Sequence, residues 1–262
     1  MRRFSLTEST NPALRHGEVF MPATGAETAS IQGVVNKTAM LTVIAVIGGL
    51  GGVALAPSLG QGAMLAVVIA AALITLVLYF AAIAKPMASV VLGPIYAVIQ
   101  GCFLGIFTYM IDSWLAANDW AVAGGVALQA FVITLAILAS MLILYTTRII
   151  QPTRKFQAVI LTCVVGIALA YLISLPLYLF DIQTPLYAMS DSGGSLLGIG
   201  LNLFILVIAS LMLIIDFGII EQKIKSGAPK RMEWFCGFIL IVALAWIYIE
   251  CVQLLARLAQ RD

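Results

Sequence analysis

The sequence predicts an all-α integral membrane protein with seven transmembrane helices. Of its 262 residues, 62% are hydrophobic and only 10% are charged, whereas soluble domains carry about 25% charged residues. The apolar runs reach about twenty residues, enough to cross a hydrocarbon core of about 30 Å at 1.5 Å per residue. A membrane barrel would show segments of about ten residues with alternating polarity. We therefore expect helices, which pair every backbone group internally.

Seven apolar stretches are long enough to span a bilayer. They are Thr38–Ala56, Ala63–Ala84, Met87–Ile111, Ala121–Tyr145, Ala158–Phe180, Leu196–Ile220 and Trp234–Leu255. The residues before them are polar and lack the apolar core of a cleavable signal peptide. We predict a cytoplasmic tail at 1–37, a seven-helix membrane domain at 38–256 and a short carboxyl-terminal tail at 257–262.

The Lys and Arg residues predict the orientation, because short loops rich in these residues stay on the cytoplasmic side. With the amino-terminal tail inside, the inner segments hold twelve of the fourteen basic residues, and only Arg257 and Arg261 lie outside. The three outer loops contain neither Lys nor Arg. We therefore predict a multi-pass protein of the cell (inner) membrane, with a cytoplasmic amino terminus and an external carboxyl terminus.

Glycines recur at the spacing used for close helix packing. Gly48 and Gly52 lie four residues apart in the first span, and Gly101 and Gly105 do so in the third. Small residues at this spacing let two helix backbones approach closely in a membrane. We interpret both pairs as helix contacts and not as ligand sites.

The sequence contains no motif for catalysis or for cofactor binding. It has no phosphate-binding loop, no HExxH metal site and no dinucleotide fingerprint, and no span pairs a nucleophile with a base. The net charge of +2 is small and its basic residues are dispersed, which does not favour nucleic-acid binding. We expect a protein that is not an enzyme and has no cofactor. Its expected partner is the lipid bilayer.

Two acidic residues inside the spans, Asp216 and Glu250, are the main functional candidates. A carboxylate at mid-membrane costs about 2.5 to 3.5 kcal/mol on insertion-based scales, so its presence suggests a role in ion or proton movement. Asn202 lies fourteen residues before Asp216 and about 40° away around the same helix. The alternative for Asp216 is a carboxylate at the cytoplasmic interface within reach of Lys223.

Glu250 shares a helix face with other polar side chains. Trp246, Gln253 and Arg257 recur at helical spacing around it. The alternative for Glu250 is a residue at headgroup level, loosely paired with Arg257. Glu221 and Glu233 bracket a basic inner loop and are expected to be ordinary interfacial charges, while Lys85, in a tight inner turn, is expected to extend its ammonium group into water.

Several segments together resemble the bacterial Bax inhibitor-1/YccA-like family of the transmembrane Bax inhibitor motif superfamily. The resemblance covers most of the chain from Asn11 onward. It is carried by the segments 31–38 (IQGVVNKT), 85–86 (KP), 94–105 (PIYAVIQGCFLG), 153–156 (TRKF), 216–221 (DFGIIE), 226–234 (SGAPKRMEW) and 246–250 (WIYIE).

The resemblance implies a fold in which two three-helix halves surround a central seventh helix. It also implies a pH-sensitive calcium leak through a carboxylate pair on helices six and seven, which by motif would be Asp216 and Glu250. Gln100 stands where this branch often has a glutamate. Two carboxylates supply at most four of the six to eight oxygens that calcium takes, so binding would be transient, and protonation would remove the attracting charge.

The positions of the two carboxylates leave open whether they meet. Asp216 lies about one turn before the cytoplasmic end of its predicted span, whereas Glu250 lies about 25 Å past Glu233 along its helix. They can meet only if helix six extends beyond Ile220 and helix seven begins in the cytosol. The sequence therefore supports a cation leak channel or proton-coupled exchanger, and alternatively a non-conducting regulator that binds other membrane proteins in quality control or stress.

Overall fold

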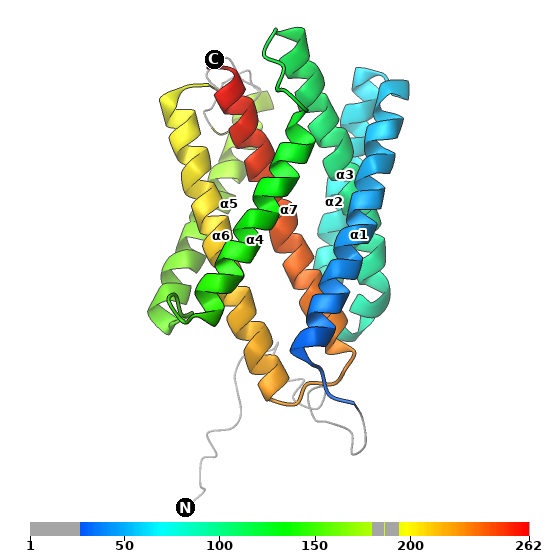
Figure 1. Ribbon diagram of the computed structural model, residues 1–262. Helices are drawn as coiled ribbons and strands as arrows, with labels where there is room; N and C mark the ends of the chain where they lie inside the picture. Colours follow the sequence, from blue (N-terminus) through cyan, green and yellow to red (C-terminus); the bar gives the residue numbers. More distant parts are fainter. Residues whose placement is uncertain (1–26, 180–185, 187–193, 262) are drawn as a thin grey trace, which may run out of the picture.

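The computed structural model describes residues 27–179, 186 and 194–261, and within them seven helices are long and apolar enough to cross a membrane (Figure 1). Most of the predicted polar tail, residues 1–26, lies outside this part of the chain. The helices are α1 (Ile31–Leu55), α2 (Gln61–Ala84), α3 (Ser89–Ala117), α4 (Val126–Thr146), α5 (Arg154–Leu179), α6 (Leu196–Lys225) and α7 (Met232–Ala259), with short 3-10 turns at Ala56–Ser58 and Pro86–Ala88.

Several helices extend beyond the apolar runs that predicted them. The first helix begins at Ile31 and not at Thr38, and the sixth continues past Ile220 to Lys225. The seventh ends at Ala259, so the residues at 257–259 belong to a helix and not to a tail. Apolar runs mark only the part of a helix that lies in hydrocarbon, and a helix that pairs its own backbone can continue into the interface.

The fourth helix starts later than its apolar run. The run begins at Ala121, but the helix begins at Val126, after two glycines whose φ angles of 79° and 77° are left-handed. That conformation interrupts a right-handed helix and suits glycine, which has no Cβ. The carboxylate of Asp112 on α3 then accepts the Val126 amide at 2.9 Å and caps the new helix.

The helices form two halves of three around α7. In the first half α1 and α2 both pack on α3, and in the second half α4 and α5 both pack on α6. The seventh helix contacts α1, α3, α4 and α6 and runs through the centre of the bundle. The predicted arrangement of two three-helix halves around a central helix is confirmed.

Glycines bring α1 and α3 into backbone contact. A Cβ atom on Gly101 would lie 2.0 Å from the Ala45 carbonyl oxygen, and one on Gly105 would lie 2.1 Å from the Gly49 carbonyl oxygen. Gly48 and Gly52 meet the backbone of α3 in the same way. The prediction that these glycines serve helix packing is confirmed.

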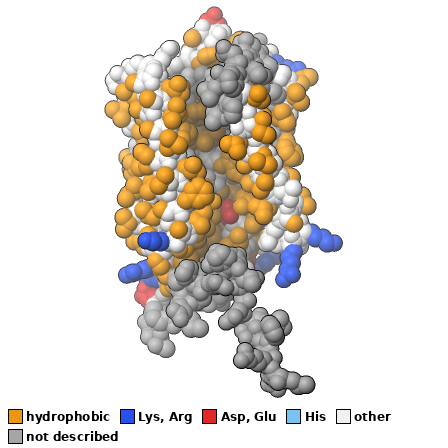
Figure 2. Space-filling model, turned by 180° about the vertical axis from the view of Figure 1, so that it is seen from behind, with side chains coloured by type: hydrophobic (Ala, Val, Ile, Leu, Met, Phe, Trp, Pro, Cys, Tyr) orange, Lys and Arg blue, Asp and Glu red, His pale blue; other side chains and the backbone are white. Residues whose placement is uncertain are grey.

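The outer surface carries the hydrophobic side chains that the bilayer requires. Large aliphatic residues of α1, α2 and α5 are widely exposed, as expected where lipid replaces water. Seen from behind, hydrophobic side chains cover both flanks of the molecule, and a hollow between them contains an acidic side chain (Figure 2). Basic side chains gather below this hydrophobic band, at the end where α6 meets α7.

Candidate functional site

Glu250 is the centre of a buried polar cluster between α5, α6 and α7. Its carboxylate is 1% exposed and accepts hydrogen bonds from Asn202 Nδ2 at 2.6 Å, Trp246 Nε1 at 3.1 Å and the Tyr171 hydroxyl at 3.2 Å. A buried charge of this kind is tolerated only when donors and opposite charges surround it. Glu250 is therefore enclosed by three helices and held by three donors, and is not paired loosely with Arg257 alone.

Arg257 and Gln253 extend the same cluster along α7. Both are buried, and the guanidinium of Arg257 lies close enough to attract the charge of Glu250. Arg257 follows Glu250 by seven residues, two helical turns, so both side chains project from one face. Sequence reasoning identified this face correctly but expected Arg257 in an external tail.

Two oxygens of this cluster have no hydrogen-bond partner in the described part of the chain. They are Asn202 Oδ1 and Gln253 Oε1, both fully buried atoms. Buried polar groups are normally paired, and ordered water often completes such a set. The two amide oxygens can therefore still accept hydrogen bonds, for example from a water molecule.

Asp216 lies on α6 in a different environment. Its side chain is 5% exposed, and within the described ranges no hydrogen bond or ion pair reaches its carboxylate. Its charge acts on Tyr79 of α2, whose ring stacks on Phe238 of α7 at 6.4 Å. Asp216 therefore faces the junction between the two halves. Its burial argues against the interfacial alternative.

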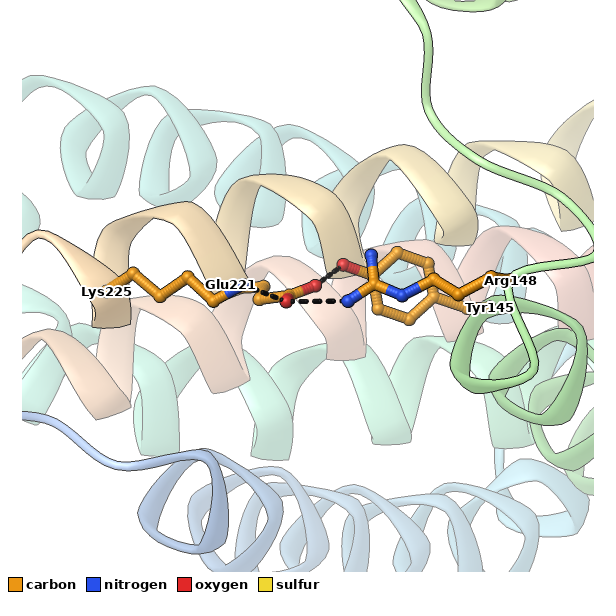
Figure 3. A network of polar contacts seen from close by, with 4 residues as sticks. All are labelled: Tyr145, Arg148, Glu221 and Lys225. Carbon is orange, nitrogen blue, oxygen red and sulfur yellow. Dashed lines mark hydrogen bonds and ion pairs between the residues drawn. The ribbon is translucent and has the colours of Figure 1, made fainter.

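Glu221 ties the α4–α5 connection to α6 (Figure 3). Its carboxylate accepts from the Tyr145 hydroxyl, from Lys225 one turn on, and from Arg148 Nη2 at 3.1 Å. Pro152 of the same connection packs on Gly218, where a Cβ would lie 2.6 Å from its ring. Glu221 is thus a network residue near the end of α6 and more than the isolated interfacial charge that was expected.

Glu233 is buried, which the sequence did not indicate. Its carboxylate is 3% exposed and accepts from the Ser30 amide at 3.0 Å and the Ser30 hydroxyl at 3.1 Å. It occupies the space above Gly33, where a Cβ would lie 1.9 Å from Oε1. Ser30 in turn caps α1 by accepting the Gly33 amide at 2.9 Å. A carboxylate at this point also complements the positive end of the helix dipole.

Replacing Ser30 by alanine is expected to lower the free energy of unfolding by about 1 kcal/mol or more, because α1 loses its cap and Glu233 loses a donor. Thermal unfolding in detergent measures the change. Ser58→Ala is the control, since the Ser58 hydroxyl bonds only to the Leu55 carbonyl at an exposed turn. Equal stability of the two variants would contradict this role for Ser30.

The family model for Bax inhibitor 1 like proteins matches residues 11–260, nearly the whole chain. The chain belongs to this family. No curated protein and no solved structure matches it. Membership of the Bax inhibitor-1 family confirms the resemblance carried by the sequence motifs, and together with the seven helices it identifies a multi-pass membrane protein.

The carboxylate pair carried over from the Bax inhibitor-1 family is not formed in this structure. Glu250 contacts Asn202, and Asp216 lies fourteen residues further along α6, which corresponds to about 21 Å at 1.5 Å per residue. Helix six does extend beyond Ile220, but α7 begins only at Met232 and reaches Glu250 near its other end. Asp216 and Glu250 therefore lie at two different depths along the pair formed by α6 and α7.

The structure also places two residues of the other family motifs, Gln100 and Lys85. Gln100 is buried on α3, and Lys85 is exposed at the junction of α2 with the following turn. In the described part of the chain, no three His, Cys, Asp or Glu side chains lie close enough together to hold a metal ion.

Two residues of the polar contacts, Ser30 and Tyr171, were not identified from the sequence. A serine directly before a helix is a capping signal that was available for Ser30, whereas Tyr171 had none.

Proposed function

We propose that this protein moves cations across the membrane, as a leak or in exchange for protons, and that Asp216 is its principal cation- and proton-binding group. The observation that carries the proposal is a buried carboxylate in a membrane helix with no hydrogen bond or ion pair within the described ranges. Such a group is costly at membrane depth unless binding a cation or a proton neutralises it. Calcium and protons both meet that requirement.

Glu250 has a second role in this proposal. Three donors and the nearby Arg257 already compensate its charge, so it has little need of a metal ion. Its hydrogen-bonded cluster suits a proton relay, because the carboxylate and the Tyr171 hydroxyl can exchange a proton directly. Asp216 and Glu250 would then act one after the other at two depths.

The segment between the two carboxylates acts as the barrier of the proposed pathway. Along α6 it buries Leu206, Ala209 and Leu213 in the core, with Ser210 as a polar side chain among them. An apolar constriction of this kind stops hydrated ions until the helices rearrange. A slow leak or a coupled exchanger fits this arrangement better than a permanently open pore.

The orientation predicted from the basic residues belongs to the same proposal. The start of α1, the α4–α5 connection and the α6–α7 connection lie at one end of the bundle, and the end of α7 lies at the other (Figure 1). By the positive-inside rule the basic end faces the cytoplasm. Asp216 is then nearer the cytoplasm and Glu250 nearer the outside of the cell membrane.

Flux through purified protein in liposomes tests the proposal, with a calcium dye inside the vesicles and the outer pH varied. We expect calcium entry that changes with pH, and in Asp216→Asn a loss of at least about tenfold, because a unit charge at close range contributes several kcal/mol. The substitution keeps size and polarity and removes only the charge.

The matched control is Asp112→Asn, at a carboxylate near the end of α3 whose amide replacement can still accept the Val126 amide. This variant should conduct like the parent protein. Full flux in Asp216→Asn would contradict the assignment of Asp216. No flux in the parent protein would exclude conduction and favour a non-conducting regulator that binds other membrane proteins.

A further inference from the structure

A cavity of about 720 Å³ opens at the basic end of the bundle, where α1, α3 and α7 begin. This volume falls in the range of about 300 to 1,000 Å³ that is usual for ligand sites. Lys37, Lys230 and Arg231 line it, together with Glu27, Glu233 and Trp234. Three cationic and two anionic side chains thus surround one space.

Both carboxylates in the lining are already engaged. Glu27 forms an ion pair with Lys230, whose hydrogen bond and charge lower the pKa of the Glu27 carboxyl. Glu233 accepts both the amide and the hydroxyl of Ser30. These two donors are neutral, so Glu233 keeps its negative charge. With Lys230 paired to Glu27, the charges of Lys37 and Arg231 outweigh that of Glu233 by one, and this excess favours an anion.

Backbone pairing gives the cavity a fixed wall. The Ala29 amide donates to the Ala228 carbonyl at 2.8 Å, and the Lys230 amide donates to the Glu27 carbonyl at 2.9 Å. These bonds attach the start of α1 to the α6–α7 connection. Lys37 is held with its ammonium group 4.6 Å from the centre of the Trp234 ring, a cation–π arrangement. The ammonium group of Lys37 is therefore positioned before a ligand arrives.

The other side of the cavity is apolar and continues onto the lipid-facing surface. Met87, Val90 and Val91 line this side. Val91, Ile95 and Val98 are 63%, 44% and 48% exposed and follow one another at helical spacing along α3. This stripe leads from the cavity toward the middle of the membrane, along the path that an acyl chain needs.

We propose that this cavity binds an anionic phospholipid, with the headgroup phosphate held by Lys37 and Arg231 and an acyl chain along the exposed stripe of α3. Basic pockets between membrane helices recognise anionic headgroups in this way. A free phosphate has the same charge but gains nothing from the apolar stripe. Bound lipid would join α1, α3 and α7 at the end where Glu233 caps α1.

Native mass spectrometry of the full-length protein in detergent tests the proposal, using phosphatidylglycerol and phosphatidylcholine with identical acyl chains. We expect phosphatidylglycerol to bind more tightly. In Lys37→Gln/Arg231→Gln its affinity should fall about thirtyfold, since each cation contributes about fivefold. The exposed single variant Arg231→Gln should lose about fivefold and provides a readout if the double variant folds poorly.

The control is Arg154→Gln/Lys155→Gln, which removes two exposed cations at the start of α5, outside the cavity. It should bind phosphatidylglycerol like the parent protein. Unchanged affinity in Arg231→Gln, or equal binding of the two lipids, would overturn the proposal. Displacement of phosphatidylglycerol by millimolar inorganic phosphate would also overturn it, in favour of a site for free phosphate.

Discussion

Gly101→Ala is expected to separate α1 from α3 and to lower the free energy of unfolding by about 3 kcal/mol or more. The added methyl group would lie 2.0 Å from the Ala45 carbonyl oxygen and 2.8 Å from the carbonyl carbon. Both atoms belong to the backbone of α1, so no side chain can rotate away. The helices must move apart along their whole contact.

Unfolding of the purified protein in mixed detergent micelles measures this loss, and size-exclusion chromatography shows whether the variant still folds. Gly166→Ala on α5 is the matched control, because nothing lies within 4 Å of its added carbon. Alanine is the better helix former by about 1 kcal/mol, so the control should be as stable as the parent or more so. Equal stability of both variants would disprove close backbone packing at Gly101.

Glu250→Leu is expected to cost about 3 to 5 kcal/mol, because it removes a buried negative charge that attracts the buried guanidinium of Arg257. Asn202, Trp246 and Tyr171 would each lose an acceptor at the same time. The measurement is again unfolding in detergent micelles. Leu240→Ile, a change of shape at a buried apolar position of the same helix, is the control and should cost less than about 1.5 kcal/mol.

A double-mutant cycle separates the charge interaction from the hydrogen bonds. Glu250→Gln, Arg257→Gln and the double variant are compared with the parent protein. If the two charges on α7 stabilise each other, the double variant should lose less free energy of unfolding than the two single variants lose together. Simple additivity would show that Glu250 is held by its three donors alone.

The two carboxylates differ in the donors and charges that surround them. The protein surrounds Glu250 with donors and a cation, whereas it leaves Asp216 without a hydrogen bond or ion pair within residues 27–179 and 194–261. This difference is the reason for proposing separate roles for the two residues. Their separation of about 21 Å along α6 also means that loss of one need not alter the other, so flux and stability should respond to different substitutions.

Much of the fold could be predicted because the bilayer imposes it on the sequence. Apolar runs of about twenty residues and the exclusion of Lys and Arg from alternate loops defined seven spans. Gly48, Gly52, Gly101 and Gly105 correctly indicated a close helix contact, since only small residues permit one. The motifs of the last third correctly indicated the Bax inhibitor-1 family.

The helix ends and the partners of the charges could not be predicted in this way. Burial of Glu233 depends on Ser30, which lies about two hundred residues earlier and reaches it only because α1 starts beside the α6–α7 connection. For a Lys or Glu near an apolar run, the sequence does not show whether the side chain faces water or a neighbouring helix. Glu221, in its network with Tyr145 and Arg148, is another such case.

The sequence alone determined the number of spans, their helical form and the presence of Asp216 and Glu250 within them, because hydrophobicity along the chain is a local property. The sequence also placed the two carboxylates at different depths, but tertiary structure alone decided that they do not meet. Depth depends on how far α6 and α7 extend past their apolar cores and on which residues face each other when they pack. That packing places Asn202, and not Asp216, beside Glu250.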